Sequence, residues 1–153
     1  MQYSACFSSH LQASPAELWQ WMTSLSGISS ELAPWLSMSA PAGITSLESL
    51  KVEPGTRLFR STLTLFGLIP IDYLDLTLLE IHPHTGFVEQ SPMGSMRFWR
   101  HERTLEPTAQ GCILTDRLVF EPRFAGAIVS PLVRWLFRHR HRQLRRRFTV
   151  VAG

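Results

Sequence analysis

Cysteine is scarce in this chain, and the two cysteines are not spaced like metal ligands or disulfide partners. Cys6 and Cys112 lie far apart, and no CxxC pair occurs. No apolar run approaches the roughly 18 to 20 residues that cross a membrane. The first residues, MQYSACFSSHLQA, lack the basic start and long apolar stretch of a secretory signal. We therefore expect reduced thiols and a cytoplasmic location.

Several motifs that carry chemistry are also missing. The sequence contains no GxSxG, HExxH or P-loop pattern. His82 and His84 flank a proline in an expected turn, but no third ligand lies nearby in the sequence. We expect no metal site and no cofactor.

Acidic residues are absent from the last part of the chain. Glu121 is the last acid, whereas seven arginines lie between Arg134 and Arg147. Residues 1–133 hold the other eight basic and all twelve acidic residues, which gives this part a net charge of −4. The net charge of +3 for the whole chain therefore comes from the seven arginines at its end. No known nucleic-acid-binding motif accompanies the arginines, so we expect no nucleic-acid partner.

Apolar residues are plentiful enough for a globular core. They make up 44% of the 153 residues, and charged residues make up 18%. The chain contains no internal repeat, low-complexity tract or linker, and its length suits one domain. We expect a single ligand-binding domain over residues 1–153.

The first expected elements are a strand and two helices. Residues 3–13 alternate loosely, as in a strand. The sequence Ser14-Pro15-Ala16-Glu17 predicts a helix start, with a serine cap, an early proline and a glutamate in the first turn. We expect this helix to end at Gly27, and a second short helix to cover residues 28–36.

A run of short strands and a long helix follow. Six or so strands are expected between the short helices and the long helix, and those with clear bounds cover residues 57–65, 71–81, 86–91, 96–106 and 112–121. Residues 125–148 form the helix, with one predicted apolar stripe: Ile128, Leu132, Trp135, Leu136 and His139. The fold class is therefore α+β, with a curved sheet of seven antiparallel strands around the C-terminal helix. Such a sheet leaves room for an apolar-ligand cavity beneath the helix.

The hairpin from Met96 to Asp116 carries a polar trio on its apolar face. Alternation places Trp99, His101, Arg103 and Leu105 on one side of the first strand, with Arg97. Opposed residue numbers in the hairpin sum to roughly 217 to 219, so Asp116 faces either His101 or Arg103. The trio is interpreted as an internal salt bridge, as a polar floor that orients a ligand, or as a catalytic site in which His101 acts as general acid or base.

Segments in order along the chain resemble a known family. These segments are HLQASPAELWQWM, WRHERTLEP with GCILTDRLVFEP, PRFAGAIVSPLV and FRHRHRQLRRRF. The chain resembles the START-like (SRPBCC) helix-grip superfamily of the polyketide cyclase/dehydrase type, which shares the fold of the birch pollen allergens. The family's W-x-H-x-H-x-F hairpin is altered here, because Arg103 replaces the second histidine and Leu105 the phenylalanine. Cys112 also replaces the threonine that follows the glycine of the second strand. An arginine does not titrate near neutrality, which weakens acid–base chemistry by a histidine pair.

The resemblance implies an internal cavity for a small hydrophobic molecule. Trp35 follows the second helix, near where the family's cavity entrance would lie, and Asp72 is a further candidate polar wall group. Each candidate residue also has an ordinary core interpretation. The predicted ligand-binding residues are Trp35, Phe59, Leu63, Tyr73, Phe87, Trp99, His101, Arg103, Asp116, Leu118 and Trp135, with Phe137 as a further possible wall residue.

Three functional classes remain open from the sequence. The first is binding or transfer of a lipid-like or aromatic, polyketide-like ligand, which we expect rather than catalysis. The second is a cyclase/dehydratase-type enzyme that uses His101. The third is a peripheral membrane or partner-binding module that meets an anionic membrane through Arg138, Arg142, Arg145 and Arg146. The arginines are also explained as a solvated helix end whose cations suit the helix dipole.

Overall fold

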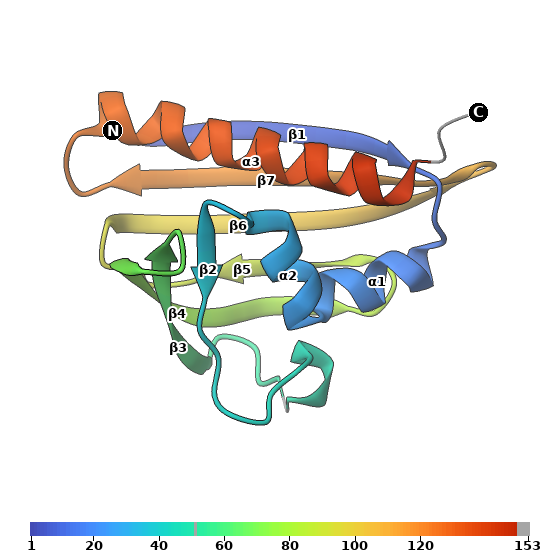
Figure 1. The fold of residues 1–153 in the computed structure, drawn as a ribbon, viewed down its shortest axis with the longest axis horizontal. Helices are drawn as coiled ribbons and strands as arrows, with labels where there is room; N and C mark the ends of the chain where they lie inside the picture. The colour runs from blue at the N-terminus through green and yellow to red at the C-terminus, as the bar shows by residue number, and fades with distance from the viewer. Residues whose placement is uncertain (51, 150–153) are drawn as a thin grey trace.

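The fold is a seven-stranded antiparallel sheet that curls around a long helix, as expected (Figure 1). The computed structural model describes residues 1–50 and 52–149. The sheet order is β1-β7-β6-β5-β4-β3-β2. The elements are β1 (Tyr3–Leu11), α1 (Pro15–Thr23), α2 (Leu25–Leu32), β2 (Leu36–Met38), the 3-10 helix η1 (Leu47–Ser49), β3 (Arg57–Leu65), β4 (Ile69–His82), β5 (Gly86–Gln90), β6 (Met96–Thr108), β7 (Gly111–Pro122) and α3 (Gly126–Phe148). The expected domain of residues 1–153 includes residues 51 and 150–153, which lie outside the described part of the chain.

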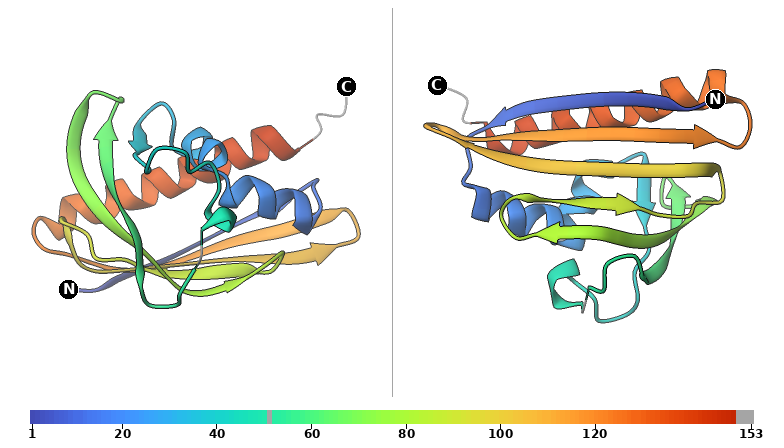
Figure 2. Two further views of the ribbon diagram at one scale, coloured as in Figure 1. Left: turned by 90° about the horizontal axis from the view of Figure 1, so that it is seen from below. Right: turned by 180° about the vertical axis from the view of Figure 1, so that it is seen from behind.

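The β3–β4 hairpin bends out of the plane of the other strands (Figure 2, left). The register shifts between Arg57 and Phe59, between Leu63 and Thr64, and between Leu78 and Glu80. Such irregularities bend a strand and increase its twist. Helix α3 meanwhile packs against β1 and β7. The curl therefore places apolar side chains of β3 and β4 opposite the helices.

The boundary between the first two helices differs from the prediction. Helix α1 ends at Thr23, and Ser24 is both its C-cap and the N-cap of α2. The Ser24 hydroxyl accepts a hydrogen bond from the backbone N–H of Gly27, at 3.0 Å. Gly27 lies inside α2. Glycine is required at this position because a Cβ would collide with the carbonyl oxygen of Trp21. The glycine permits close approach of the two helices and does not end the first one.

The register of the β6–β7 hairpin agrees with the prediction. Arg103 lies opposite Asp116, and both side chains are buried. Arg97 is the exception on the predicted apolar face, because it is exposed while Met96 is buried. A register shift between Met96 and Phe98 explains the change of face.

The buried face of α3 also differs from the predicted stripe. Ile128, Leu132 and Trp135 are exposed, although His139 is buried. Phe137 and Leu144 are buried instead, together with Ser130 and His141. The helix has apolar residues on two sides, and the hydrophobic periodicity alone does not tell which side meets the sheet.

Candidate functional site

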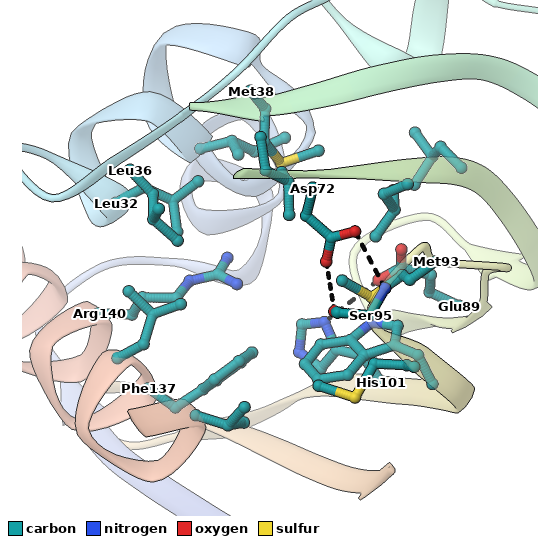
Figure 3. Close-up of a pocket in the computed structure, with 18 of the residues that line it drawn as sticks. Leu32, Leu36, Met38, Asp72, Glu89, Met93, Ser95, His101, Phe137 and Arg140 are labelled. Carbon is teal, nitrogen blue, oxygen red and sulfur yellow. Dashed lines mark hydrogen bonds and ion pairs between the residues drawn. The ribbon is translucent and has the colours of Figure 1, made fainter. Parts of the chain in front are cut away.

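A cavity of about 380 Å³ lies between the curled sheet, α2, β2 and α3 (Figure 3). Leu32, Leu36 and Met38 line it on one side, and Met93 and Phe137 line it on others. The volume falls within the roughly 300 to 1,000 Å³ of small-molecule sites, and apolar walls are typical of them. The cavity is therefore the candidate functional site.

Polar groups reach the cavity at opposite walls. Asp72 accepts hydrogen bonds from the backbone N–H of Tyr73 at 2.8 Å and of Ser95 at 3.1 Å, and also from the Ser95 hydroxyl. His101 and Glu89 lie in the floor near this wall, whereas the guanidinium of Arg140 extends into the cavity from α3 (Figure 3). A ligand inside would therefore meet few polar groups.

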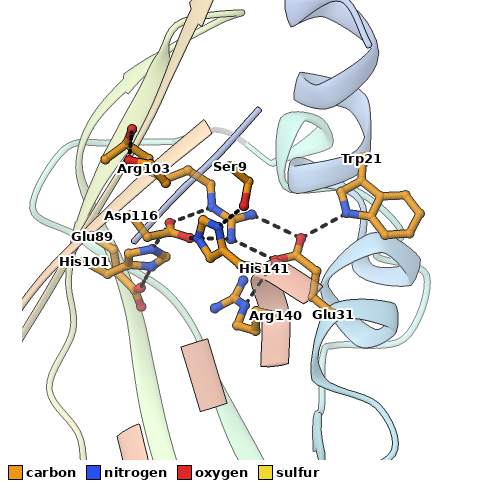
Figure 4. Close-up of polar contacts among 11 residues, drawn as sticks. Ser9, Trp21, Glu31, Glu89, His101, Arg103, Asp116, Arg140 and His141 are labelled. Atoms are coloured by element: carbon orange, nitrogen blue, oxygen red, sulfur yellow. Dashed lines mark hydrogen bonds and ion pairs between the residues drawn. The ribbon is translucent and has the colours of Figure 1, made fainter. Parts of the chain in front are cut away.

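Behind the floor, the carboxylate of Asp116 is the centre of a buried network (Figure 4). Its Oδ1 lies 2.6 Å from Nε2 of His101 and accepts a hydrogen bond from Nε of Arg103 at 2.8 Å. Its Oδ2 lies 2.7 Å from Nε2 of His141 and accepts from Nη2 of Arg103 at 3.0 Å. Four contacts match the acceptor capacity of a carboxylate, so Asp116 has none left for a ligand.

The second hub of the network is Glu31 on α2, whose side chain is fully buried. Nη2 and Nη1 of Arg103 donate to its two oxygens at 2.8 and 3.1 Å. Nε of Arg140 donates to it at 3.1 Å, and the indole N–H of Trp21 donates at 3.0 Å. Arg103 therefore connects α2 to the hairpin through carboxylates on both sides.

A third branch joins α3 to β1. Nδ1 of His141 lies 2.7 Å from the hydroxyl of Ser9, which accepts from Nη1 of Arg145 at 3.1 Å. If Nε2 of His141 carries the proton toward Asp116, Nδ1 accepts from the Ser9 hydroxyl, and both ring nitrogens of His141 are satisfied. Sequence reasoning missed Glu31, Arg140, His141 and Ser9. The signal for them was the arginine- and histidine-rich end of α3, which was interpreted as a solvated helix end or as a contact with an anionic membrane or partner.

The protonation states of the network follow from its contacts. Burial alone would raise the pKa of Asp116, but Arg103 and His101 hold it well below its usual value. Burial would likewise raise the pKa of Glu31, and Arg103 and Arg140 lower it. Burial would lower the pKa of His101, yet the charge and hydrogen bond of Asp116 raise it. Both carboxylates are thus ionised, and His101 favours its protonated form.

Both ring nitrogens of His101 face carboxylates. Nε2 contacts Asp116, and Nδ1 lies 3.6 Å from Oε1 of Glu89. A general base needs a nitrogen within hydrogen-bond reach of the substrate. The geometry therefore favours a positioning and charge-balancing role for His101 over proton transfer.

The cavity brings together most residues that the sequence singled out. Those in its lining are Trp35, Phe59, Leu63, Phe87, Trp99, His101, Arg103 and Trp135, together with Asp72 and Phe137. Tyr73 lies outside the lining, and the guanidinium of Arg60 lies 4.2 Å from its ring centre. Asp116 lies behind the floor, and Leu118 is part of the core.

The indole N–H of a tryptophan beside the cavity lacks a hydrogen-bond partner among the described residues. The indole Nε1 of Trp99 is buried and makes no hydrogen bond within the described residues. Trp99 lines the cavity and is only 9% exposed. A buried donor without an acceptor is costly, which makes this atom a candidate contact for a ligand.

The described residues contain neither a membrane-spanning helix nor a metal-binding cluster. None of the described helices is long and apolar enough to cross a membrane. No group of three or more histidine, cysteine, aspartate or glutamate side chains in residues 1–50 and 52–149 is arranged to hold a metal ion.

Solved structures share this fold at low sequence identity. Protein CV1439 from Chromobacterium violaceum has a TM-score of 0.72 and 14% identity, with 92% of this chain and 94% of that chain covered. The Zhui aromatase/cyclase from Streptomyces sp. R1128 has a TM-score of 0.68 and 9% identity, covering 94% and 92%. Ara h 8.0201 has a TM-score of 0.59 and 14% identity, covering 94% and 98%. The chain thus shares the helix-grip fold of these structures, as the resemblance to the SRPBCC superfamily predicted.

Sequence comparison places the chain in a family. No curated protein matches it. A family model described as "Domain of unknown function (DUF8410)" matches residues 9–148, which span almost all of the chain. The chain belongs to the DUF8410 family.

Proposed function

We propose that the protein binds a small hydrophobic molecule in the cavity beneath α3. The observation that carries this proposal is the cavity itself, with about 380 Å³ of space and mostly apolar walls. Burial of apolar ligand surface against such walls contributes roughly 25 cal/mol per Å² before the costs of association. The fold supports the same function, because its members typically bind hydrophobic ligands.

Two donors give the ligand an orientation. Nε of Arg140 pairs with Glu31, and its terminal nitrogens make no hydrogen bond within the described part of the chain. The indole N–H of Trp99 is also unpaired there. Both residues line the cavity. We infer that the ligand carries an acceptor, such as a carbonyl or hydroxyl oxygen, that meets one of these donors.

The charge balance favours a ligand without a negative charge. Glu31, Glu89 and Asp116 face the cations Arg103, Arg140 and, when protonated, His101. These formal charges cancel. A carboxylate ligand would add one uncompensated charge to a low-dielectric site, and Asp72 on the other wall adds to the repulsion.

Displacement of a fluorescent probe tests the proposal. N-phenylnaphthylamine is neutral and apolar, and we expect its fluorescence to rise when it enters the cavity. Decanol should displace the probe more strongly than decanoate. The two competitors have the same alkyl chain, but only decanoate carries a negative charge, which the cavity does not balance. Stronger displacement by decanoate would contradict the proposed ligand charge but not the proposed cavity.

A variant with a filled cavity tests the place of binding. Val133 lines the cavity, so Val133→Trp should abolish the fluorescence increase. Val119 alternates with the buried Leu118 and Phe120 on β7 and faces the other side of the sheet, so Val119→Trp is the matched control and should bind normally. Equal binding by both folded variants, or no binding by the folded wild type, would overturn the proposed function.

A further inference from the structure

The exposed apolar side chains gather in two segments. Apart from Met1 and Tyr73, the large exposed hydrophobic side chains of the described residues lie in two places. One group surrounds the turn between β3 and β4, and the other lies just before α3 and along its first half. Leu68 is 81% exposed and Phe124 is 68% exposed. The full set is Phe66, Leu68, Ile69, Ile71, Phe124, Ile128, Leu132 and Trp135. A concentration of this kind marks an interaction surface.

Trp35 joins the two segments. Its ring centre lies 5.7 Å from that of Phe66 at the hairpin and 5.0 Å from that of Trp135 on α3. Ile71, Leu132 and Trp135 line the cavity and are also exposed to solvent. The apolar surface, together with Trp35, therefore surrounds an opening of the cavity, and we call it the mouth surface.

Arginines continue the exposed side of α3 beyond the mouth surface. Trp135, Arg138 and Arg142 follow one another at spacings of three and four residues, so they lie along one side of the helix. Arg138 and Arg142 are exposed, and neither has a hydrogen-bond or ion-pair partner in the described ranges. Neither residues 63–71 nor α3 contains an acid. The surface thus changes from apolar to cationic with no negative charge in these segments.

We propose that the mouth surface docks on an anionic phospholipid bilayer. Phe, Leu, Ile and Trp side chains suit the boundary between headgroups and acyl chains, and arginines suit the phosphates beside it. Charge complementarity favours a membrane over a second copy of this chain, because two mouth surfaces would bring their arginines together. Docking itself does not depend on the proposed ligand. It would open the cavity toward the lipid phase, so that an apolar ligand need not cross water.

Flotation with vesicles tests this proposal. Purified protein without added ligand should float with vesicles of equimolar phosphatidylcholine and phosphatidylglycerol, and less with phosphatidylcholine alone. Binding should fall as salt is added, because the electrostatic part is screened. The N-phenylnaphthylamine assay is run in parallel, so loss of membrane binding is distinguished from loss of the cavity.

Two kinds of variant separate the apolar and cationic contributions. Leu68→Asp should weaken vesicle binding at least tenfold, since it places a charge at the most exposed apolar position of the mouth surface. Arg138→Gln and Arg142→Gln should each weaken it about fivefold, because a basic side chain near an anionic membrane contributes about 1 kcal/mol. Neither change touches the buried network.

The matched controls lie away from the mouth surface. Gln110→Asp introduces the same charge at the exposed turn between β6 and β7, at the other end of the sheet (Figure 2). Arg117→Gln removes an exposed arginine from the opposite face of β7. Both controls should bind vesicles like the wild type. The proposal would be overturned if the protein did not float with the vesicles, or if the controls lost as much binding as the test variants. It would also be overturned if the protein bound no vesicles and instead formed a stable dimer that Leu68→Asp dissociates.

Discussion

Arg103 on β6 holds Glu31 on α2 by two hydrogen bonds of 2.8 and 3.1 Å, although the residues are 72 positions apart. Both side chains are almost completely inaccessible to water. The same guanidinium donates twice to Asp116 on β7. One arginine therefore ties the short helices that cover the cavity to the sheet that forms its floor.

Loss of Glu31 should be strongly destabilising. Glu31→Ala leaves Arg103 and Arg140 without a shared partner in a buried site. We expect the free energy of unfolding to fall by about 3–5 kcal/mol, as for other broken buried ion pairs. Urea denaturation followed by circular dichroism measures this. Glu102→Ala, on the opposite face of β6, is the control and should cost less than about 1 kcal/mol. Equal losses of stability in the two variants would show that the buried network does not stabilise the fold more than an exposed carboxylate does.

The shape of the arginine side chain should matter as well as its charge. Arg103→Lys keeps the cation but cannot donate to both carboxylates from a planar fork. We expect a loss of about 1–3 kcal/mol in the free energy of unfolding. Arg103→Met should lose more, because it removes all four of these hydrogen bonds and the cation between the buried carboxylates of Glu31 and Asp116. If Arg103→Lys were as stable as the wild type, the bidentate geometry of the arginine would not contribute to stability.

Part of this site was predictable from local sequence. The turn between the two strands and their alternation placed either His101 or Arg103 opposite Asp116, because hairpin register follows from the turn, and the structure pairs Arg103 with it. Glu31 was not predictable in the same way. It lies on a helix of eight residues, and its partners on β6 and α3 come together only through tertiary packing. A single sequence carries no periodic signal for such a contact.

The long helix shows the same limit. Its extent was predicted within one residue, whereas its buried side was not. Ile128, Leu132 and Trp135 form a regular apolar stripe and are nevertheless exposed. The sheet instead meets Phe137 and the polar His141, which is buried because Asp116 and Ser9 satisfy its ring nitrogens. Hydrophobic periodicity cannot anticipate a polar residue that is buried through its partners.

Protonation of His101 should make stability depend on pH. The pKa of His101 in the folded protein is raised from 6.5, because Asp116 and Glu89 outweigh burial and the repulsion of Arg140. Its stabilising contribution is therefore complete below about pH 6.5 and is lost as pH rises through the folded pKa. Urea denaturation from pH 6 to pH 9 should show a decline in the wild type.

His101→Asn is the comparison for this pH series. Asparagine keeps a donor for Asp116 but does not titrate, so the decline above neutral pH should become smaller. The buried carboxylates affect stability at acidic pH instead. The pKa of Asp116 is lowered from 3.8, so its stabilising contribution is lost only as pH falls through the folded pKa. An unchanged slope in His101→Asn would assign the decline to other groups.

Two buried serines should respond oppositely to the same substitution. Ser61 on β3 is fully buried, and its hydroxyl has no hydrogen-bond partner in the described chain. Ser61→Ala removes an unsatisfied polar group and should raise the free energy of unfolding by about 0.5–1.5 kcal/mol. The hydroxyl of Ser9 instead joins His141 to Arg145, so Ser9→Ala should lower it by about 1–3 kcal/mol. Thermal and urea denaturation of the two variants measure both effects under identical conditions. A stability loss in Ser61→Ala as large as that in Ser9→Ala would mean that the Ser61 hydroxyl has a partner, such as a buried water molecule, that stabilises the fold.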